Sequence, residues 1–237
     1  MMASVSPPRS AGTSYELSRA ALETYFDRTA RDAWERLTSD APVSRIRPTV
    51  RAGRDRMRET LLGGLPADMR GLRLLDAGCG TGALAVEAAR RGAEVVAIDV
   101  AAGLINIARE RAGEAGIDWR VGDMADPALG DFDHVVAMDS LIHYRAADIV
   151  SALAALAPRT RRSIAFTFAP RTPALAAMHA AGKFFPRGDR APAIVPVREA
   201  RLRHAIGEAL PDWRIGGGRR ISGGFYTSHA LHVVRHG

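Results

Sequence analysis

The stretch DAGCGTG, from Asp76 to Gly82, decides the fold of this chain of 237 residues. It follows the apolar run LRLL, residues 72–75, a pattern typical of a strand that is buried on both faces. Glycine allows the backbone to turn sharply and to come close to a ligand. The N-terminus of the helix expected at residues 83–91 offers free N–H donors and a partial positive charge. The sequence therefore predicts a ligand-binding turn between a buried strand and a helix.

Strands and helices alternate regularly after this turn. Four further strands are predicted by short apolar runs, which end at Asp99, Val121, Asp139 and Ala169. Helices are expected between and after them, over residues 103–115, 146–156 and 198–210. This alternation indicates βαβ units and a parallel sheet with helices on both faces. Two last strands, over 213–219 and 224–234, predict an antiparallel hairpin that completes a seven-stranded, Rossmann-like α/β sheet.

Composition and pattern divide the chain into three parts. Residues 1–14 are expected to form a disordered tail, and residues 15–70 an N-terminal arm or lid made of two helices, over 15–37 and about 47–62, the first with a loose apolar stripe. Residues 71–237 carry the predicted α/β domain. Within this domain, an insertion over about residues 170–197 contains five prolines. Long irregular connections of this kind usually act as lids or binding loops.

Acidic side chains indicate which ligand the glycine turn binds. The spacing of Gly78, Gly80 and Ala83 would also suit a nicotinamide dinucleotide, so the glycines alone do not decide. However, acids stand at or just after the ends of three successive predicted strands, at Asp76, Asp99 and Asp123. Three carboxylates would repel a pyrophosphate but suit a ligand with a cationic sulfonium and an ammonium group. The sequence therefore predicts an S-adenosylmethionine-dependent enzyme with the class I methyltransferase fold.

Each expected cofactor contact has its own chemistry. We expect Asp76 to accept from the ammonium group and Asp99 to hold ribose hydroxyls. Asp123 would accept from the adenine amino group, and Met124 would cover the adenine ring. Cys79 is expected to serve as a small residue of the turn. The full predicted cofactor set is Asp76, Gly78, Cys79, Gly80, Asp99, Val100, Asp123, Met124 and Met138.

The segment SLIHY, residues 140–144, follows the fourth predicted strand. Open α/β sheets bind ligands outside the carboxyl ends of their strands, so this segment is expected to face the methyl donor. His143 is accordingly expected to contact the substrate. The proline-aromatic motif common at this place in methyltransferases that act on planar amines is absent, which disfavours that class.

Six segments carry a specific family resemblance. They are TYFDRTARDAW (24–34), DAGCGTGALA (76–85), MDSLIHY (138–144), FTFAPRT (166–172), FFPRGDRAPAI (184–194) and ISGGFYTSHAL (221–231). On these segments the chain resembles the magnesium-protoporphyrin IX methyltransferases of bacteriochlorophyll and chlorophyll biosynthesis, and the bacterial branch fits best. The resemblance runs from about Tyr15 to the C-terminus.

The resemblance implies methyl transfer to one propionate of magnesium-protoporphyrin IX, which gives the monomethyl ester. It places the family's reactive tyrosine and histidine on Tyr25 and His143. It also implies an arm that folds over the bound cofactor, with Trp34 as a packing member, and a partner in the porphyrin-carrying subunit of magnesium chelatase. A carboxylate is already ionised at neutral pH, so orientation by Tyr25 and His143 is expected rather than strong base catalysis.

The insertion offers what a tetrapyrrole needs. Phe184, Phe185 and Pro186 present flat apolar surface, and basic side chains beside them can meet propionates through charge-assisted hydrogen bonds. The predicted substrate-binding residues are Trp34, Tyr144, Lys183, Phe185, Arg187 and Arg190.

Composition excludes several other classes. A single cysteine excludes a disulfide framework, and no ligand spacing suggests a protein-bound metal, so the magnesium is expected to arrive inside the substrate. No apolar run is long enough to span a membrane, and no secretory signal is evident. A cytoplasmic protein is expected, with peripheral association to the photosynthetic membrane.

Charge is concentrated at the end of the chain. Residues 151–237 carry 14 basic and 4 acidic side chains, an excess of 10. This excess would attract an anionic substrate, an acidic protein or an anionic membrane. No recognition helix or aromatic-basic RNA motif accompanies it, so no nucleic-acid partner is expected. Two alternatives stay open: an O-methyltransferase for another carboxylate or hydroxyl compound, and a silent S-adenosylmethionine-binding porphyrin carrier.

Overall fold

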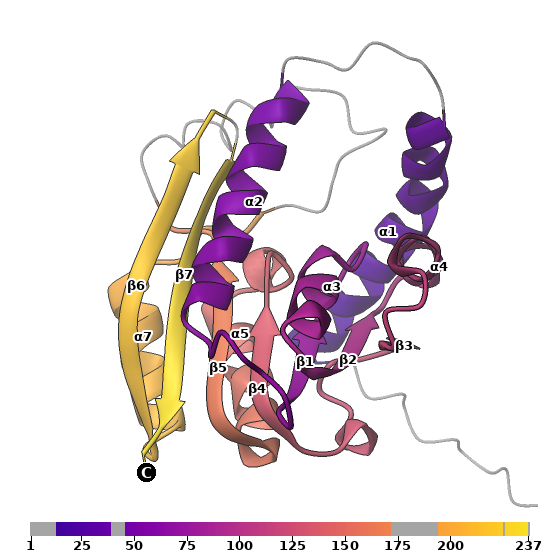
Figure 1. Cartoon of the computed structure of the whole chain (residues 1–237). Helices are drawn as coiled ribbons and strands as arrows, with labels where there is room; N and C mark the ends of the chain where they lie inside the picture. The colour runs from indigo at the N-terminus through magenta and orange to yellow at the C-terminus, as the bar shows by residue number, and fades with distance from the viewer. Residues whose placement is uncertain (1–12, 39–45, 172–193, 225, 237) are drawn as a thin grey trace, which may run out of the picture.

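The fold is a central seven-stranded sheet in the order β3-β2-β1-β4-β5-β7-β6 (Figure 1). This computed structural model describes residues 13–38, 46–171, 194–224 and 226–236. The strands are β1 (Arg73–Ala77), β2 (Glu94–Asp99), β3 (Asp118–Val121), β4 (Phe132–Ala137), β5 (Thr160–Phe168), β6 (Trp213–Gly223) and β7 (Tyr226–Arg235). Strands β1 to β5 pair in parallel, and β7 pairs antiparallel with both β5 and β6. The predicted Rossmann-like sheet and its terminal hairpin are confirmed.

The helices fall close to their predicted places. They are α1 (Ser14–Thr38), α2 (Ile46–Gly63), α3 (Ala83–Arg90), α4 (Ala102–Ala112), α5 (Ala146–Leu156) and α7 (Glu199–Ala209). Short 3-10 turns are η1 (Pro127–Leu129), η2 (Leu141–His143) and η3 (Ala157–Arg159). Helix α4 is shorter than predicted because Gly113 adopts a φ of +56° and ends it. Ser14 already begins α1, and residues 1–12 of the predicted tail lie outside the described residues.

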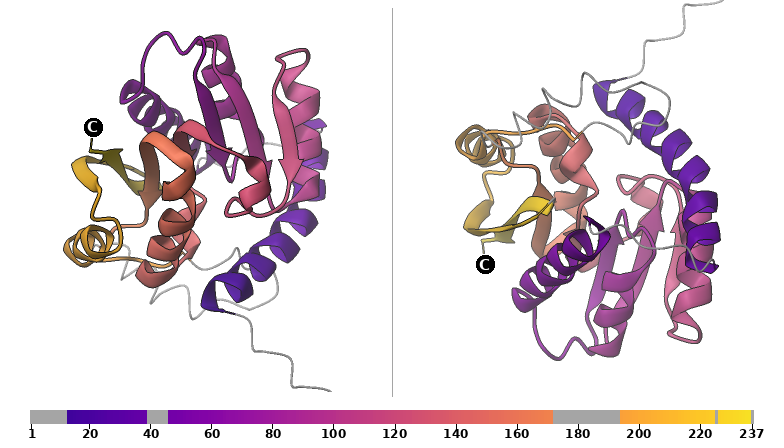
Figure 2. Two further views of the ribbon diagram at one scale, coloured as in Figure 1. Left: turned by 90° about the horizontal axis from the view of Figure 1, so that it is seen from below. Right: turned by 90° about the horizontal axis from the view of Figure 1, so that it is seen from above.

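Alternating strand residues divide the core between the two faces of the sheet. Leu75 and Val96 pack on the face covered by α5 and α7, whereas Leu74 and Val95 pack on the face covered by α2 and α3. Successive side chains of a strand point to opposite faces, so strands buried on both faces read as continuous apolar runs. Figure 2 views the sheet along its strands and shows the helices on either side.

The two helices of the predicted arm are placed differently. Helix α2 crosses the face of β7 and β6 (Figure 1), and its Met57 and Leu61 are fully buried in the core. A Cβ on Gly53 would lie only 2.5 Å from Cδ1 of Tyr226, so α2 sits directly on the Tyr226 ring. Helix α1 lies beside α4 and α5 and buries its own Leu22 in the core. Only α1 therefore has the character of an appended arm.

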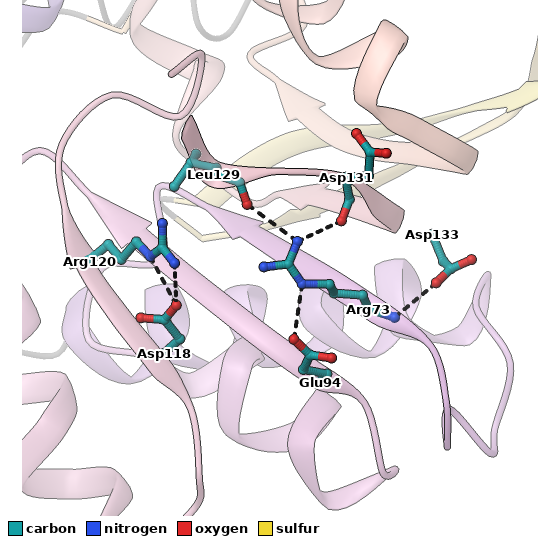
Figure 3. Close-up of polar contacts among 7 residues, drawn as sticks. All are labelled: Arg73, Glu94, Asp118, Arg120, Leu129, Asp131 and Asp133. Carbon is teal, nitrogen blue, oxygen red and sulfur yellow. Dashed lines mark hydrogen bonds and ion pairs between the residues drawn. The ribbon is translucent and has the colours of Figure 1, made fainter. Parts of the chain in front are cut away.

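An arginine ties the amino ends of three strands, at the edge of the sheet opposite the glycine turn (Figure 3). Arg73 Nε donates to Glu94 Oε1 at 3.1 Å, and its Nη1 donates to the carbonyl oxygens of Leu129 and Asp131 at 3.3 and 2.7 Å. The Arg73 amide donates to the carboxylate of Asp133 at 3.0 Å. These contacts fix β1 between β2 and β4, the strands whose other ends carry the candidate site.

Replacing Gly53 with alanine should destabilise the protein by about 1–3 kcal/mol, because the added methyl group collides with the Tyr226 ring. Urea unfolding measures the change. Gly207→Ala in α7 is the matched control, since nothing lies within 4 Å of the position of its Cβ and alanine favours a helix. A Gly53→Ala protein as stable as the Gly207→Ala protein would contradict this packing of α2.

Candidate functional site

The glycine turn and the end of β4 meet at the carboxyl edge of the sheet. Gly78, Gly80 and Gly82 have φ values of +78°, +55° and +79°, in the left-handed region that favours glycine. A Cβ on Gly78 would lie 2.3 Å from the Cβ of Ser140, so no other residue fits there without displacing the segment after β4. The backbone of the turn can therefore be approached closely by a ligand, and the turn also lies in close contact with the SLIHY segment.

A cavity of about 580 Å³ opens at this edge, which we call the central cavity. Its size suits a small-molecule ligand. The predicted cofactor residues that line it are Gly78, Gly80, Asp99, Val100, Met124 and Met138. The predicted reactive and substrate-binding residues that line it are Tyr25, His143 and Tyr144. One cavity thus brings together most of the residues that the sequence assigned to donor and acceptor.

Asp99 links the glycine turn to the start of α4. Its Oδ2 accepts the Gly80 amide at 2.9 Å and its Oδ1 accepts the Ala101 amide at 3.0 Å. Burial raises the pKa of Asp99, and these N–H donors act against that rise. An ionised carboxylate has about four acceptor positions, so these amides leave room for a ribose hydroxyl. Asp99 can therefore shape the turn and hold a ligand at once.

Asp76 is a buried carboxyl group that lacks a full set of partners. It lines a second cavity of about 770 Å³ between α2, the glycine turn and α3, which we call the side cavity. Only 1% of Asp76 is exposed, and its Oδ2 has no hydrogen-bond partner within the described chain. Burial raises the pKa of Asp76 to about 7. A bound ammonium group would supply the missing donor, so the site fits the amino-acid end of S-adenosylmethionine.

Cys79 lines the side cavity together with Asp76. Burial and the two nearby aspartates raise the pKa of its thiol well above the ordinary value. Because the thiolate is the nucleophilic form, this raised pKa lowers the reactivity of Cys79 at neutral pH. This agrees with its expected place as a small residue of the turn.

Asp123 is held by α1 and is not among the residues that line the central cavity. Tyr15 Oη donates to Asp123 Oδ1 at 2.7 Å, and Arg19 Nε lies 3.5 Å from Oδ2. Burial first, and then Asp123, raise the pKa of Tyr15 well above its ordinary value, so the phenol keeps the proton that it donates. The structure thus pairs Asp123 with α1, where the sequence led us to expect an adenine contact. Tyr15 is a further site residue that sequence reasoning missed.

Aromatic rings from α1 cover the cavity. Tyr15 stacks on Tyr144 with ring centroids 5.3 Å apart. Phe26 makes edge-to-face contacts with His143 at 6.0 Å and with Tyr25 at 5.3 Å. Phe26, which the sequence analysis did not single out, therefore links the two expected reactive side chains. Its signal in the sequence was its place beside Tyr25 in the TYFDRTARDAW segment.

Asp139, just after β4, makes several polar contacts and was not among the predicted site residues. Its φ of +55° is uncommon for a residue other than glycine, and its amide donates to Thr167 Oγ1 at 2.7 Å. Its carboxylate accepts from Tyr226 Oη at 3.0 Å and from Ser228 Oγ at 3.2 Å. Arg54 Nε forms an ion pair with Oδ2 at 3.4 Å. Strain of this kind gathers at functional sites, and Asp139 lines the central cavity.

The described C-terminal end of the insertion, residues 194–197, reaches the same cavity. Val197 donates its amide to the Ala169 carbonyl at 2.8 Å, and Val195 donates to the Ile142 carbonyl at 2.9 Å. Ile194 lines the central cavity. The predicted residues Lys183, Phe185, Arg187 and Arg190 lie outside the described residues, as does the side chain of Trp34.

No described helix is long and apolar enough to cross a membrane. The part of the chain that the structure describes contains no group of three or more His, Cys, Asp or Glu side chains arranged to hold a metal ion.

Comparison with known proteins identifies the family. A family model described as the magnesium-protoporphyrin IX methyltransferase C-terminus matches residues 137–235, and a general methyltransferase-domain model matches residues 74–162. The magnesium-protoporphyrin O-methyltransferase of Rhodobacter capsulatus is 50% identical over 221 residues, which cover 92% of this chain and 96% of that protein. The chain belongs to the magnesium-protoporphyrin O-methyltransferase family. The resemblance expected from the six segments is confirmed.

Solved structures of this family agree with the fold and the cofactor. The magnesium protoporphyrin IX methyltransferase of Synechocystis PCC 6803 with bound SAH has a TM-score of 0.78 and 28% identity, and covers 92% of this chain and 99% of that one. The same enzyme with bound SAM has a TM-score of 0.72 and 25% identity, and covers 96% and 99%. The predicted class I methyltransferase fold and the S-adenosylmethionine cofactor are confirmed.

The pKa of Asp76 leads to a prediction for donor binding. Affinity for S-adenosylhomocysteine, measured by calorimetry, should rise between about pH 5 and the carboxyl pKa of about 7 and level off above it. The reason is that the ligand's ammonium group needs the ionised carboxylate, and protons compete for it below that pKa.

Asp76→Asn should weaken binding and remove this pH dependence. Glu114→Gln, which changes an exposed carboxylate away from both cavities, is the matched control and should keep the wild-type profile. A pH-independent affinity in the wild type would show that Asp76 does not hold the ammonium group.

Proposed function

We propose that this chain transfers the methyl group of S-adenosylmethionine to one propionate carboxylate of magnesium-protoporphyrin IX. The products are the monomethyl ester and S-adenosylhomocysteine. The observation that carries this function is the central cavity, in which the glycine turn of a methyl-donor site faces Tyr25 and His143. Membership of the magnesium-protoporphyrin O-methyltransferase family names the substrate.

The reaction requires little acid–base catalysis by the protein. S-adenosylmethionine, when bound, supplies a methyl group on a positively charged sulfur. A propionate titrates near pH 4, about as free carboxylic acids do, so its oxygen is already a nucleophile at neutral pH. The protein must hold that oxygen in line with the bond to the methyl group and keep water away. Positioning of this kind can contribute roughly 7–11 kcal/mol to catalysis.

Tyr25 and His143 are the proposed orienting residues. Both line the central cavity from different elements, Tyr25 from α1 and His143 from the end of η2. Phe26 packs edge-on against both rings and restricts their orientation. In this position each side chain can hydrogen-bond a propionate oxygen, and neither needs to remove a proton from it.

Helix α1 is the proposed cover of the donor site. Three of its side chains form hydrogen bonds with the rest of the domain: Tyr15 donates to Asp123 at 2.7 Å, Ser14 Oγ donates to Asp148 Oδ2 at 3.0 Å, and Asp27 accepts the Gly103 amide at 3.2 Å. These hydrogen bonds are part-buried or exposed, so each costs little to break, whereas opening the helix also exposes the buried side chain of Leu22. Closure of α1 excludes water from the reacting oxygen.

The insertion is the proposed contact for the macrocycle. Its described C-terminal end lies beside Ile142 and the central cavity, which supports a substrate role for Lys183, Phe185, Arg187 and Arg190 ahead of it in the chain. A hydrophobic porphyrin is poorly soluble in water, so direct delivery by the porphyrin-carrying subunit of magnesium chelatase is the proposed route. The basic excess after residue 151 supports a cytoplasmic enzyme that associates peripherally with the photosynthetic membrane.

The function itself is tested by incubating the chain with labelled S-adenosylmethionine and magnesium-protoporphyrin IX. The expected product is a labelled monomethyl ester, identified by mass spectrometry. Donor binding without any ester would favour a porphyrin carrier, and labelling of other carboxylate or hydroxyl compounds in preference to the porphyrin would favour a different O-methyltransferase.

Removing the orienting residues should separate turnover from binding. His143→Ala and Tyr25→Phe should each lower kcat roughly 10- to 100-fold, the effect of losing one hydrogen bond to a charged group. Affinity for S-adenosylhomocysteine should change by less than about threefold. His204→Ala, on an exposed histidine of α7, is the control and should leave kcat unchanged. Full activity of His143→Ala would remove this residue from the mechanism.

Charge reversal tests the insertion. Arg187→Glu combined with Arg190→Glu should raise the apparent KM for magnesium-protoporphyrin IX by about tenfold or more, because propionates would meet like charge. Arg201→Glu, on an exposed face of α7, controls for a general effect of net charge. An equal KM for the double variant and the control would contradict substrate binding by these two arginines.

A further inference from the structure

The central cavity has an unusual charge balance for the ligands of the proposed reaction. The donor carries an amino-acid carboxylate, and the porphyrin carries two propionates. Asp99 and Asp139 already bring two acidic groups to the lining. Among the described residues that line this cavity, Arg54 is the one lysine or arginine. Any ligand carboxylate in the described part of this cavity therefore has one permanent positive charge to meet.

The position of Arg54 is set by the packing of α2. Its neighbour Gly53 lies directly against the Tyr226 ring, which fixes this turn of α2 over the end of β4. Arg54 lines both the central cavity and the side cavity, so its guanidinium stands where the two cavities meet. Its side chain is 54% exposed and can change direction, whereas that of Asp139 is 11% exposed and fixed.

The contact between Arg54 and Asp139 is weak enough for Arg54 to exchange it for a contact with a ligand. Arg54 Nε lies 3.4 Å from Asp139 Oδ2, longer than a charge-assisted hydrogen bond of about 2.8 Å. Half-exposed ion pairs of this kind are weak. Tyr226, Ser228 and Thr167 all donate to Asp139 as well. The carboxylate of Asp139 therefore remains hydrogen-bonded when the guanidinium turns to another partner.

The hydroxyl groups that donate to Asp139 stay protonated. Burial, and then the charge of Asp139, raise the pKa of Tyr226 well above its ordinary value. Asp139 thus holds Arg54 at the mouth of the cavity without depending on it. A guanidinium has five N–H donors in a planar fork, which matches the two oxygens of a carboxylate.

We propose that Arg54 binds a ligand carboxylate where the central cavity meets the side cavity, and that Asp139 holds it ready for this ligand. The carboxylate belongs either to the amino-acid end of the methyl donor or to a porphyrin propionate. The second source rests on the proposed function, whereas the first rests on the methyl donor alone. Arg54 is thus assigned as a binding residue, separate from the orienting side chains Tyr25 and His143.

Paired ligands that differ in the carboxylate test this assignment. S-adenosylhomocysteine is compared with methylthioadenosine, which lacks the amino-acid end, and magnesium-protoporphyrin IX with its dimethyl ester. Calorimetry and porphyrin fluorescence measure the four affinities in wild type, Arg54→Gln and Arg54→Lys. Arg54→Gln should weaken the carboxylate-bearing member of one pair by about tenfold or more and leave its partner ligand within about twofold. Arg54→Lys keeps the positive charge but loses the planar fork of the guanidinium. Its affinity for the carboxylate-bearing ligand should therefore lie between those of the wild type and Arg54→Gln.

The pair that responds identifies the source of the carboxylate. An effect on S-adenosylhomocysteine alone assigns Arg54 to the donor, and an effect on the free-acid porphyrin alone assigns it to the substrate. Arg56→Gln, an exposed arginine on α2 that lines neither cavity, is the matched control. Affinities that are unchanged for all four ligands, or lowered equally within both pairs, would overturn the proposal. Because the donor pair is measured without methyl transfer, it stays informative even if no ester forms.

Discussion

Gly78 and Ser140 approach each other so closely that neither of their turns can move alone. A Cβ on Gly78 would lie 2.3 Å from that of Ser140, and Ser140 Oγ donates to the Ala77 carbonyl at 2.9 Å. The first turn is the donor-binding element, and the second continues into His143. One contact between β1 and β4 therefore sets the separation between donor and acceptor, and the rest of the site is arranged around it.

Two helices from the beginning of the chain complete this arrangement in different ways. Helix α2 is part of the core, with Met57 and Leu61 fully buried, and it brings Arg54 to a fixed edge of the site. Helix α1 is attached mainly through single polar contacts and stacked rings, such as Tyr15 on Tyr144. The family's chemistry needs both kinds of helix. The buried α2 gives a rigid frame for the reacting atoms, and α1 gives a cover that can admit a large, flat substrate.

Local signals in the sequence were sufficient for the sheet and the glycine turn, and six of the nine predicted donor-binding residues line the central cavity. Glycine, strand-end acids and apolar runs act over a few residues, so the turn at Gly78, the position of Asp99 and the parallel sheet with its terminal hairpin could be anticipated. The sequence could not show that Tyr15 would hydrogen-bond to Asp123, because 108 residues separate them. The contacts of Asp139 could not be predicted for the same reason, because its partners come from the distant elements α2, β5 and β7. Burial of α2 was also missed, since its arginine-rich face resembles an exposed helix.

The order of β6 and β7 has a consequence for how the molecule acquires activity. Strand β7 lies between β5 and β6, although β6 precedes it in the chain. As the polypeptide leaves the ribosome, β6 has no strand to join until β7 has emerged and entered the sheet. Tyr226 and Ser228, which hold Asp139, arrive with β7. A nascent chain therefore carries an unfinished site, and a ligand meets a complete pocket only after the whole sheet has formed.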